Sequence, residues 1–410
     1  MLKVIFSRRM LVAFIMGFSS GLPLLLTIGV LQAWMKEEGV DLTWIGMITL
    51  VQIPYTWKFI WAPLLDRFTP AFLGRRRGWL LVSQLALMVS IVALGYSDPV
   101  NRAGMMVVTA MLVAFFSASQ DIVVDAYRRE DLPDEELGLG SSMYIYGYRL
   151  GMLLASGGGL IMADHMPYSR VYLIMAMCIL PGLLTTLLTP EPKVTAGTPQ
   201  TMKAAIVNPL VEYFSRKHAI WILVFILLYK IGDTMASAIS MPFYLEIGFS
   251  KTEVGAVVKF FGTGATLGGA FLGGLILLRL GINRSLWIFG VLQALSTAFF
   301  AVLARIGYSI SALSAVIAFE NLSSGMGTAA FVAFMASITN KKFTATQYAL
   351  LTSLIGIPRA VASSATGFMA KHIGWEGFFI ICTLVAIPGM LLLLKFAPWN
   401  SEAAMEAEAI

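Results

Sequence analysis

Charged residues are scarce in this chain. Of its 410 residues, 13% are charged and 58% are hydrophobic, whereas average soluble domains contain about 25% charged residues. This excess of apolar residues is too large for the core of a soluble protein, and it indicates that lipid is the solvent. The formal net charge of +6 does not predict nucleic-acid binding, because the basic residues are scattered in short loops between apolar runs.

Cysteine and histidine are also rare. The two cysteines, Cys178 and Cys382, lie deep in apolar runs, and the three histidines have no metal-ligand spacing. We therefore expect no disulfide framework, no metal site and no cofactor. Because no nucleophile–base grouping of His, Cys or Asp is found, we do not expect an enzyme.

Long apolar runs, in contrast, are abundant. A bilayer core about 30 Å thick needs roughly 20 apolar residues of helix. On this criterion we predict an all-α membrane protein with twelve transmembrane helices. They begin near Leu11, Thr43, Trp79, Ala103, Leu139, Val171, Ala219, Thr252, Ser285, Tyr308, Gln347 and Gly377. No small-residue cleavage site follows the first run, so we expect a retained span and not a signal peptide.

The spans fall into two halves. We predict a six-helix bundle at 1–190, a cytoplasmic linker at 191–217, a second six-helix bundle at 218–397 and a short cytoplasmic tail at 398–410. Within the linker, Met202 to Phe214 is expected to form an amphipathic surface helix. Lys and Arg are about three times as frequent in the segments on the N-terminal side of the membrane as in the opposite loops, which places both termini in the cytoplasm.

The two halves share short sequence matches. "EEGVDLTWIG" from Glu37 matches "EIGFSKTEVG" from Glu246, 209 residues later, and "MADHMPY" from Met162 matches "MAKHIGW" from Met369, 207 residues later. These matches occur in order at nearly one offset and indicate a duplicated six-span unit. Such parallel halves resemble the major facilitator transporters, whose substrate sites lie between the halves near the bilayer midplane.

Ionisable residues inside the spans are few and unevenly distributed. We find nine: Lys58, Asp121, Asp125, Arg149, Lys230, Asp233, Lys259, Glu320 and Arg359. The third, sixth, ninth and twelfth spans have none, and in the major facilitator fold these four helices are outer supports. A charge at the bilayer centre costs about 2.5–3.5 kcal/mol even on the lenient scale, so we expect these groups to face one another or a wet cavity.

Several roles are open for the acids. Lys230 and Asp233 are spaced i, i+3 and share a helix face. They form either a structural ion pair or a cavity pair in which Lys230 attracts an anion. Asp121 and Asp125 are spaced i, i+4. This pair suits a proton carrier, because neighbouring like charges favour protonation; alternatively, Asp125 belongs to an intracellular gate with Arg128 or Arg129.

Two further in-span groups have open interpretations. Glu320 is either a proton site or a partner for Arg359 or Lys58. Lys259 lies closer to the outer face, where its side chain reaches the interface.

Four motifs carry a specific family resemblance. "GFSSGLPLLLT" from Gly17, "YTWKFIWAPLLDR" from Tyr55, "SQDIVVDAYR" from Ser119 and "TATQYALLTSL" from Thr344 resemble the AmpG muropeptide permeases, which are major facilitator members related to the acetyl-coenzyme A transporters. The resemblance implies proton-driven import of N-acetylglucosaminyl-1,6-anhydro-N-acetylmuramyl peptides across the bacterial inner membrane for peptidoglycan recycling. The implied partners are an anionic glycopeptide, protons and the lipid bilayer, and we expect a monomer.

Site assignments follow from the motifs and the in-span charges together. Substrate carboxylates and sugars are expected to meet Lys58, Arg149, Lys230, Arg359, Gln120, Tyr55 and Tyr229. The coupling proton is expected on Asp121, Asp125, Asp233 or Glu320. The gate is expected at Asp66, Arg67, Arg75 and Arg76, which match a stretched form of the major facilitator loop motif.

Other functions remain open at this point. A carrier of another anionic conjugate, such as a coenzyme A ester or a siderophore, would use similar cations. A non-transporting receptor would usually carry a sizeable cytoplasmic domain, and the predicted tail after Pro398 is too short for one.

Overall fold

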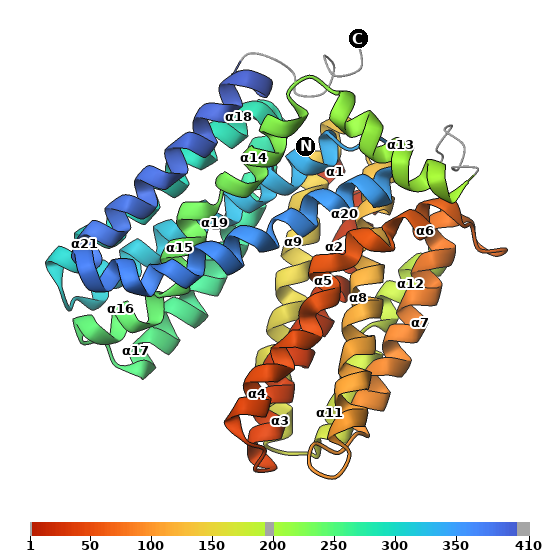
Figure 1. Ribbon diagram of the computed structural model, residues 1–410, viewed down its shortest axis with the longest axis horizontal. Helices are drawn as coiled ribbons and strands as arrows, with labels where there is room; N and C mark the ends of the chain where they lie inside the picture. The colour runs from red at the N-terminus through yellow and green to blue at the C-terminus, as the bar shows by residue number, and fades with distance from the viewer. Residues whose placement is uncertain (1, 193–200, 400–410) are drawn as a thin grey trace. The chain divides into compact units, whose positions relative to one another are not determined.

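The computed structural model describes residues 2–192 and 201–399, except the side chains at 2, 3, 42, 43, 46, 251, 252 and 356–365. The described residues form helices, and no strand is found among them (Figure 1). Two compact units are present. Unit 1 comprises Met1–Pro133, Met143–Leu210 and Thr339–Ser353, and unit 2 comprises Asp134–Ser142, Val211–Ile338 and Leu354–Ile410. The predicted domain boundaries stay a prediction, and most of the predicted tail lies outside the described residues.

Unit 1 is built mainly from the first half of the chain. Its helices are α1 (Leu2–Ile5), α2 (Arg8–Leu25), η1 (Leu26–Val30), α3 (Leu31–Glu37), α4 (Leu42–Met47), η2 (Ile48–Gln52), α5 (Ile53–Trp57), η3 (Lys58–Ile60), α6 (Ala62–Arg67), α7 (Arg75–Gly95), α8 (Ala103–Asp131), η5 (Leu154–Gly158), α10 (Gly159–Ala163), α11 (Tyr168–Met177) and α12 (Leu180–Leu188). Helices α7 and α8 run side by side (Figure 1).

Unit 2 contains most of the second half. Its helices are η4 (Asp134–Glu136), α14 (Ala219–Leu228), α15 (Ile231–Ala238), α16 (Ser240–Ile247), α17 (Lys251–Val254), η6 (Gly255–Phe261), α18 (Gly262–Ile306), α19 (Ile310–Ser337) and α21 (Gly356–Phe396). Three further helices have residues in both units: α9 (Leu137–Leu153), α13 (Met202–Ser215) and α20 (Thr344–Leu354).

Several helices are locally irregular. The segments η1, η5 and η6 are π-helical, and η2 and η3 are 3₁₀-helical. Such segments depart from the usual i→i+4 hydrogen-bond pattern. In η1, the carbonyl of Leu26 accepts a 2.9 Å hydrogen bond from the hydroxyl of Tyr172, so a side chain from α11 contacts this irregular segment.

Seven helical segments of the described chain are long and apolar enough to cross a membrane. Two continuous helices each contain a kink, at Gly281 in α18 and at Gly374 in α21, and the two predicted spans of each pair lie on either side of the kink. The predicted count of twelve is not fully confirmed.

Glycines with positive φ support the predicted internal duplication. Gly39 (φ 75°) and Gly248 (φ 108°) occupy the same place in the two matched motifs, 209 residues apart. Gly74 (φ 87°) precedes α7, and Gly281 (φ 75°) lies 207 residues later at the kink of α18. This backbone conformation favours glycine, so the two halves place these glycines at nearly the same offset.

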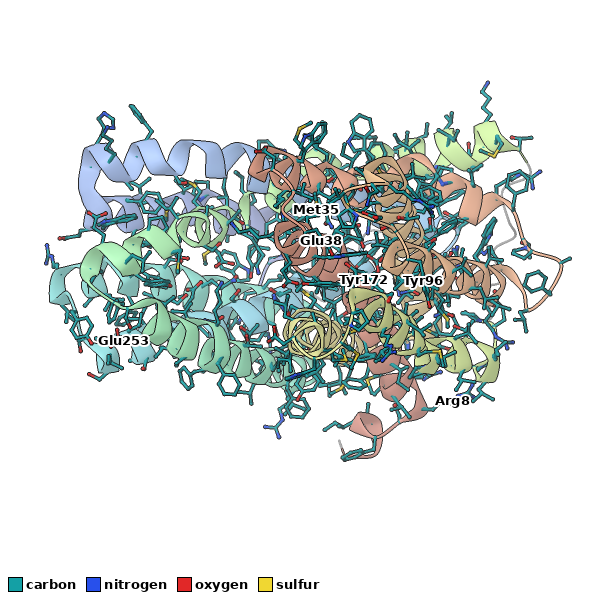
Figure 2. The ribbon with its side chains drawn as sticks, turned by 90° about the horizontal axis from the view of Figure 1, so that it is seen from below. Arg8, Met35, Glu38, Tyr96, Tyr172 and Glu253 are labelled. Carbon is teal, nitrogen blue, oxygen red and sulfur yellow. The ribbon has the colours of Figure 1, made fainter. Side chains whose placement is uncertain are left out.

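Each unit has its own apolar core. In unit 1, Trp34 stacks on Tyr168 with ring centroids 5.2 Å apart, and Met35 and Tyr172 belong to the same buried cluster (Figure 2). In unit 2, Phe243 packs against Phe379 at 4.7 Å in an edge-to-face arrangement. Edge-to-face and stacked aromatic pairs add to the stabilisation that burial provides.

Helix α17 begins with a capping box, just before the apolar helical segment that starts at Gly255. The backbone N–H of Glu253 donates to the hydroxyl of Ser250, and the Glu253 carboxylate accepts from the backbone N–H of Ser250 at 2.8 Å. The hydroxyl of Tyr308 also donates to Glu253, and these hydrogen bonds lower the pKa of the Glu253 carboxyl. Glu253 is labelled in Figure 2.

The predicted surface helix of the linker is present as α13. Ala205 and Tyr213 are buried on one face, whereas Val211 and Phe214 are exposed on another. The helix itself is present, but apolar side chains lie on both its buried and its exposed faces, so its amphipathic character stays a prediction.

Helices α2 and α9 approach closely through glycine. A Cβ added at Gly147 would overlap the carbonyl oxygen of Phe14, and one added at Gly17 would overlap that of Tyr144. We expect Gly147→Val to lower the free energy of unfolding by about 1–3 kcal/mol through overpacking, measured by thermal unfolding in detergent. The control is Gly104→Ala, where an added Cβ meets nothing within 4 Å; equal effects of the two substitutions would contradict the prediction.

Candidate functional site

A buried charge network connects α6, α7 and α8 in unit 1. The Arg76 side chain is fully buried, and its Nη2 donates to Asp66 at 2.8 Å and to Glu130 at 2.6 Å. Arg75 donates to the same Glu130 at 3.1 Å. Glu130 also accepts from Nε of Arg76 at 3.0 Å, so this carboxylate is bound by two guanidinium groups. Three of the four predicted gate residues thus lie in one network.

Helix α20 is attached to this network at its N-terminus. Asp66 accepts from the backbone N–H of Thr346 at 2.8 Å and from its hydroxyl at 2.7 Å. A carboxylate at this position satisfies N–H groups that have no partner within the helix, and it interacts favourably with the helix dipole. Asp66 therefore joins the Arg76 cluster to a segment 280 residues later in the chain.

The alternative of a gate role for Asp125 is supported by its partner. Arg128 donates to Asp125 at 3.0 Å and to the hydroxyl of Tyr348 in α20 at 2.9 Å. The guanidinium also lies 4.7 Å from the ring centroid of Tyr144. Asp125 thus helps to position an arginine that contacts α20.

Asp121 lies one turn before Asp125 in a buried polar region. Lys58, whose side chain is buried, acts electrostatically on the carboxyls of both Asp121 and Asp125. Gln120 is fully buried and donates to the hydroxyl of Ser20 at 3.4 Å. Tyr55 is half-buried in α5, which packs against α8. Lys58, Gln120 and Tyr55 therefore lie in the same region of unit 1 as Asp121.

The structure describes the side chain of Arg149 but not that of Arg359. Arg149 is half-buried in α9, and no hydrogen bond or ion pair of its guanidinium is found among the described residues. Arg359 lies in α21, but its side chain is outside the described part of the chain.

Unit 2 contains a second polar cluster, at the start of α15. The Nζ of Lys230 is 3.7 Å from Asp233 and donates to the hydroxyl of Thr328 at 2.6 Å. Ser324 donates to Asp233 at 3.4 Å, and Ser296 donates to Glu320 at 2.6 Å. The predicted i, i+3 pair is therefore present and lies near Glu320.

Two of the predicted site residues make contacts of a different kind. The hydroxyl of Tyr229 donates to the carbonyl of Leu286 at 2.9 Å, and its ring stacks on Phe331 at 5.4 Å. This buried residue packs the core of unit 2, and its contact with a sugar stays a prediction. Arg67 lies over the ring of Phe68 at 5.4 Å, apart from the Arg76 network.

Sequence reasoning missed several partners. Glu130 was not selected, although it directly follows Arg128 and Arg129 at the end of an apolar run. Glu191 accepts from the backbone N–H groups of Arg76 and Arg77 at 2.7 and 3.0 Å, where it caps α7. A search for acids near the basic loop would have found both.

Comparison with known proteins identifies the family. The pattern of the Major Facilitator Superfamily matches residues 10–363. The chain is 43% identical over 395 residues to the anhydromuropeptide permease of Escherichia coli strain K12, an alignment that covers 96% of this chain and 80% of the relative. The chain belongs to the Major Facilitator Superfamily and, within it, to the anhydromuropeptide permease family.

Solved structures show the same fold. The proton:xylose symporter XylE bound to 6-bromo-6-deoxy-D-glucose superposes with a TM-score of 0.74 at 13% identity, covering 97% of each chain. The E. coli fucose:proton symporter FucP superposes with a TM-score of 0.72 at 14% identity, covering 93% of this chain and 97% of that one. The predicted major facilitator fold is confirmed, and this membrane transporter belongs to a family of permeases and not of enzymes.

Proposed function

We propose that this protein imports N-acetylglucosaminyl-1,6-anhydro-N-acetylmuramyl peptides across the bacterial inner membrane, in symport with protons, for peptidoglycan recycling. The observation that carries this proposal is the 43% identity over 96% of the chain to a relative named anhydromuropeptide permease. The protein acts as a monomer in the lipid bilayer, with both termini in the cytoplasm.

The proposed substrate is anionic because its peptide carries carboxylates. A site that binds it therefore needs cationic side chains. Arg149 supplies a half-buried guanidinium with no protein partner among the described residues, a group that favours bidentate contact with a carboxylate. Lys58 and Lys230 supply ammonium groups near acids, which hold them in place until substrate binds. We retain Arg359 as a fourth cation from its place in the sequence, and Gln120 and Tyr55 as polar neighbours of the sugars.

Transport proceeds by alternating access. The contacts of Asp66 with Thr346 and of Arg128 with Tyr348 hold α20 on unit 1. In the proposed cycle these contacts break and re-form once per turnover, while the proton is taken up outside and released inside. Asp66 and Arg76 therefore serve gating, with Arg75 acting through Glu130.

Uptake by purified protein in proteoliposomes tests the proposal. With labelled anhydromuropeptide outside and an imposed gradient, alkaline inside, we expect accumulation that a protonophore abolishes. Unlabelled anhydromuropeptide should compete, whereas a coenzyme A ester and a siderophore should not. Absence of uptake, or competition by either of the latter compounds alone, would contradict the proposed substrate, and uptake that ignores the gradient would contradict the coupling.

A further inference from the structure

Lys230 lies at the break between α14, which ends at Leu228, and α15, which begins at Ile231. Its backbone has φ −109° and ψ 11°, away from the usual helical values. The carbonyl of Lys230 accepts from the N–H of Thr234 at 2.9 Å and from the hydroxyl of the same residue at 2.8 Å. The backbone at Lys230 is thus held by α15, while its side chain extends to α19 of the same unit (Figure 1).

The ammonium of Lys230 lies closer to a hydroxyl of α19 than to the acid on its own helix. Its Nζ donates to the hydroxyl of Thr328 at 2.6 Å but is 3.7 Å from Oδ2 of Asp233. In a charge-assisted hydrogen bond, an ammonium and a carboxylate oxygen are about 2.7–2.9 Å apart. The contact with this oxygen of Asp233 is therefore a loose ion pair, and Thr328 holds the ammonium more closely.

The hydroxyl of Thr328 faces Lys230 as an acceptor. A hydroxyl has one O–H donor, and that of Thr328 donates to the carbonyl of Ser324 at 2.7 Å. Its lone pairs remain for other partners, and an ammonium, which has three donors and no acceptor, needs such lone pairs. The orientation that Lys230 requires is therefore set within α19 itself.

Ser324 weakens the attraction between Lys230 and Asp233 in a second way. Its hydroxyl donates at 3.4 Å to Oδ2 of Asp233, the same oxygen that faces the ammonium. This donor satisfies part of the negative charge that attracts Lys230. Ser324 and Thr328 are spaced i, i+4 and share a face of α19, so one hydroxyl binds the acid and the other binds the ammonium.

Resting on the proposed function, we infer that Thr328 is a positioning residue whose hydroxyl holds the Lys230 ammonium back from Asp233, so that a carboxylate of the substrate's peptide can pair with it. Without this hydroxyl, the ammonium closes to hydrogen-bond distance from Asp233, and the substrate has to break a tight ion pair. Thr328 acts through Lys230 and does not touch the substrate. The Lys230 and Asp233 side chains are 18% and 21% exposed, so a ligand can reach them.

The concentration dependence of uptake by full-length protein in proteoliposomes tests the inference. Thr328→Val keeps the branched shape but removes the lone pairs. We expect its KM for labelled anhydromuropeptide to rise about tenfold, the effect of losing one hydrogen bond to a charged group, while Vmax per folded protein stays near that of wild type. Thr328→Ser restores the hydroxyl and should restore KM. An unchanged KM in Thr328→Val, or an equal rise in Thr328→Ser, would overturn the inference.

Thr383 of α21 provides the matched control. It is half-buried in unit 2, and its hydroxyl donates at 2.9 Å to the carbonyl of Phe379, four residues earlier, as that of Thr328 does to Ser324. No cation contact of this hydroxyl is found in the part of the chain that the structure describes. Thr383→Val therefore removes the same kind of intrahelical bond and should leave KM unchanged. An equal rise in both valine variants would contradict a role through Lys230.

A neutral competitor distinguishes the positioning of Lys230 from a direct contact between Thr328 and the sugar. An anhydromuropeptide whose peptide carboxylates are amidated has no peptide carboxylate for Lys230. Its inhibition constant against labelled uptake should therefore be the same in wild type and in Thr328→Val. A parallel loss of affinity for this analogue would assign the hydroxyl to the sugar and refute the positioning role.

A second variant covers the case in which Thr328→Val does not fold. Ser324→Ala removes the donor to Asp233 but keeps the backbone carbonyl that orients Thr328, so KM should rise in the same direction by a smaller factor. An unchanged KM in this variant would also refute the inference. Failure of the proposed function gives a different result, because wild-type protein would then take up no labelled anhydromuropeptide, and the inference would fall with it.

Discussion

Uptake of labelled anhydromuropeptide is expected to fall about 30-fold or more when Arg149 is replaced by Ala. Truncating one partner of a desolvated, hydrogen-bonded charge pair costs about 2–5 kcal/mol, and each 1.4 kcal/mol is about a factor of ten in affinity. Arg149 is half-buried and has no protein partner among the described residues. Its removal therefore leaves no other protein side chain without a hydrogen-bond or ion-pair partner. The measurement is the initial rate of uptake against substrate concentration in proteoliposomes.

Arg305→Ala provides the matched control for Arg149. Arg305 pairs with Glu376 at 2.6 Å, and its side chain is 74% exposed, so its removal should leave uptake within about twofold, as expected for a surface ion pair. Arg149→Lys keeps the positive charge but removes the planar guanidinium that donates two parallel hydrogen bonds. This variant should recover part of the uptake that Arg149→Ala loses. If Arg149→Ala transports at the wild-type rate, Arg149 does not bind substrate.

Replacing Glu130 by Ala is expected to lower the free energy of unfolding by about 3–5 kcal/mol, the usual cost of removing one partner of a buried ion pair. Arg76 is completely buried, and Glu130 accepts from both its Nε and its Nη2. Without Glu130, Asp66 is the one carboxylate partner of this guanidinium left among the residues that the structure describes. Arg75 loses its partner in the same substitution.

Thermal unfolding in detergent measures this loss, with Glu212→Ala as its control. Glu212 of α13 pairs at 2.6 Å with Arg216, which follows the helix, in a more exposed setting, where an ion pair contributes about 0.2–1 kcal/mol. A loss below 1 kcal/mol in Glu130→Ala would show that the buried network contributes little to stability.

Local spacing predicted part of the site. The i, i+3 interval placed Lys230 beside Asp233, and the loop motif brought Asp66 and Arg76 together. Both predictions concern residues that are close together in the sequence or that belong to one known motif. The equivalence of Gly39 and Gly248 could also be predicted from the sequence, because both glycines occupy the same position in the two matched motifs.

Long-range contacts were beyond such reasoning. Thr346 binds Asp66 across 280 residues, and Tyr348 binds Arg128 across 220. The hydroxyl of Tyr229 donates to the backbone carbonyl of Leu286 across 57 residues, a contact that the sequence did not predict. Hydropathy does not distinguish these cases, because it records how apolar a segment is and not which helix lies opposite each side chain.

The membership of Thr339–Ser353 in unit 1 has a consequence for biogenesis. The carboxylate of Asp66 cannot meet its hydrogen-bond donors in this segment until the ribosome has added residue 346. Early in translation, unit 1 therefore lacks its segment Thr339–Ser353. For the same reason, a split gene that encodes the halves on either side of the linker would yield an N-terminal fragment that depends on its complement to finish folding.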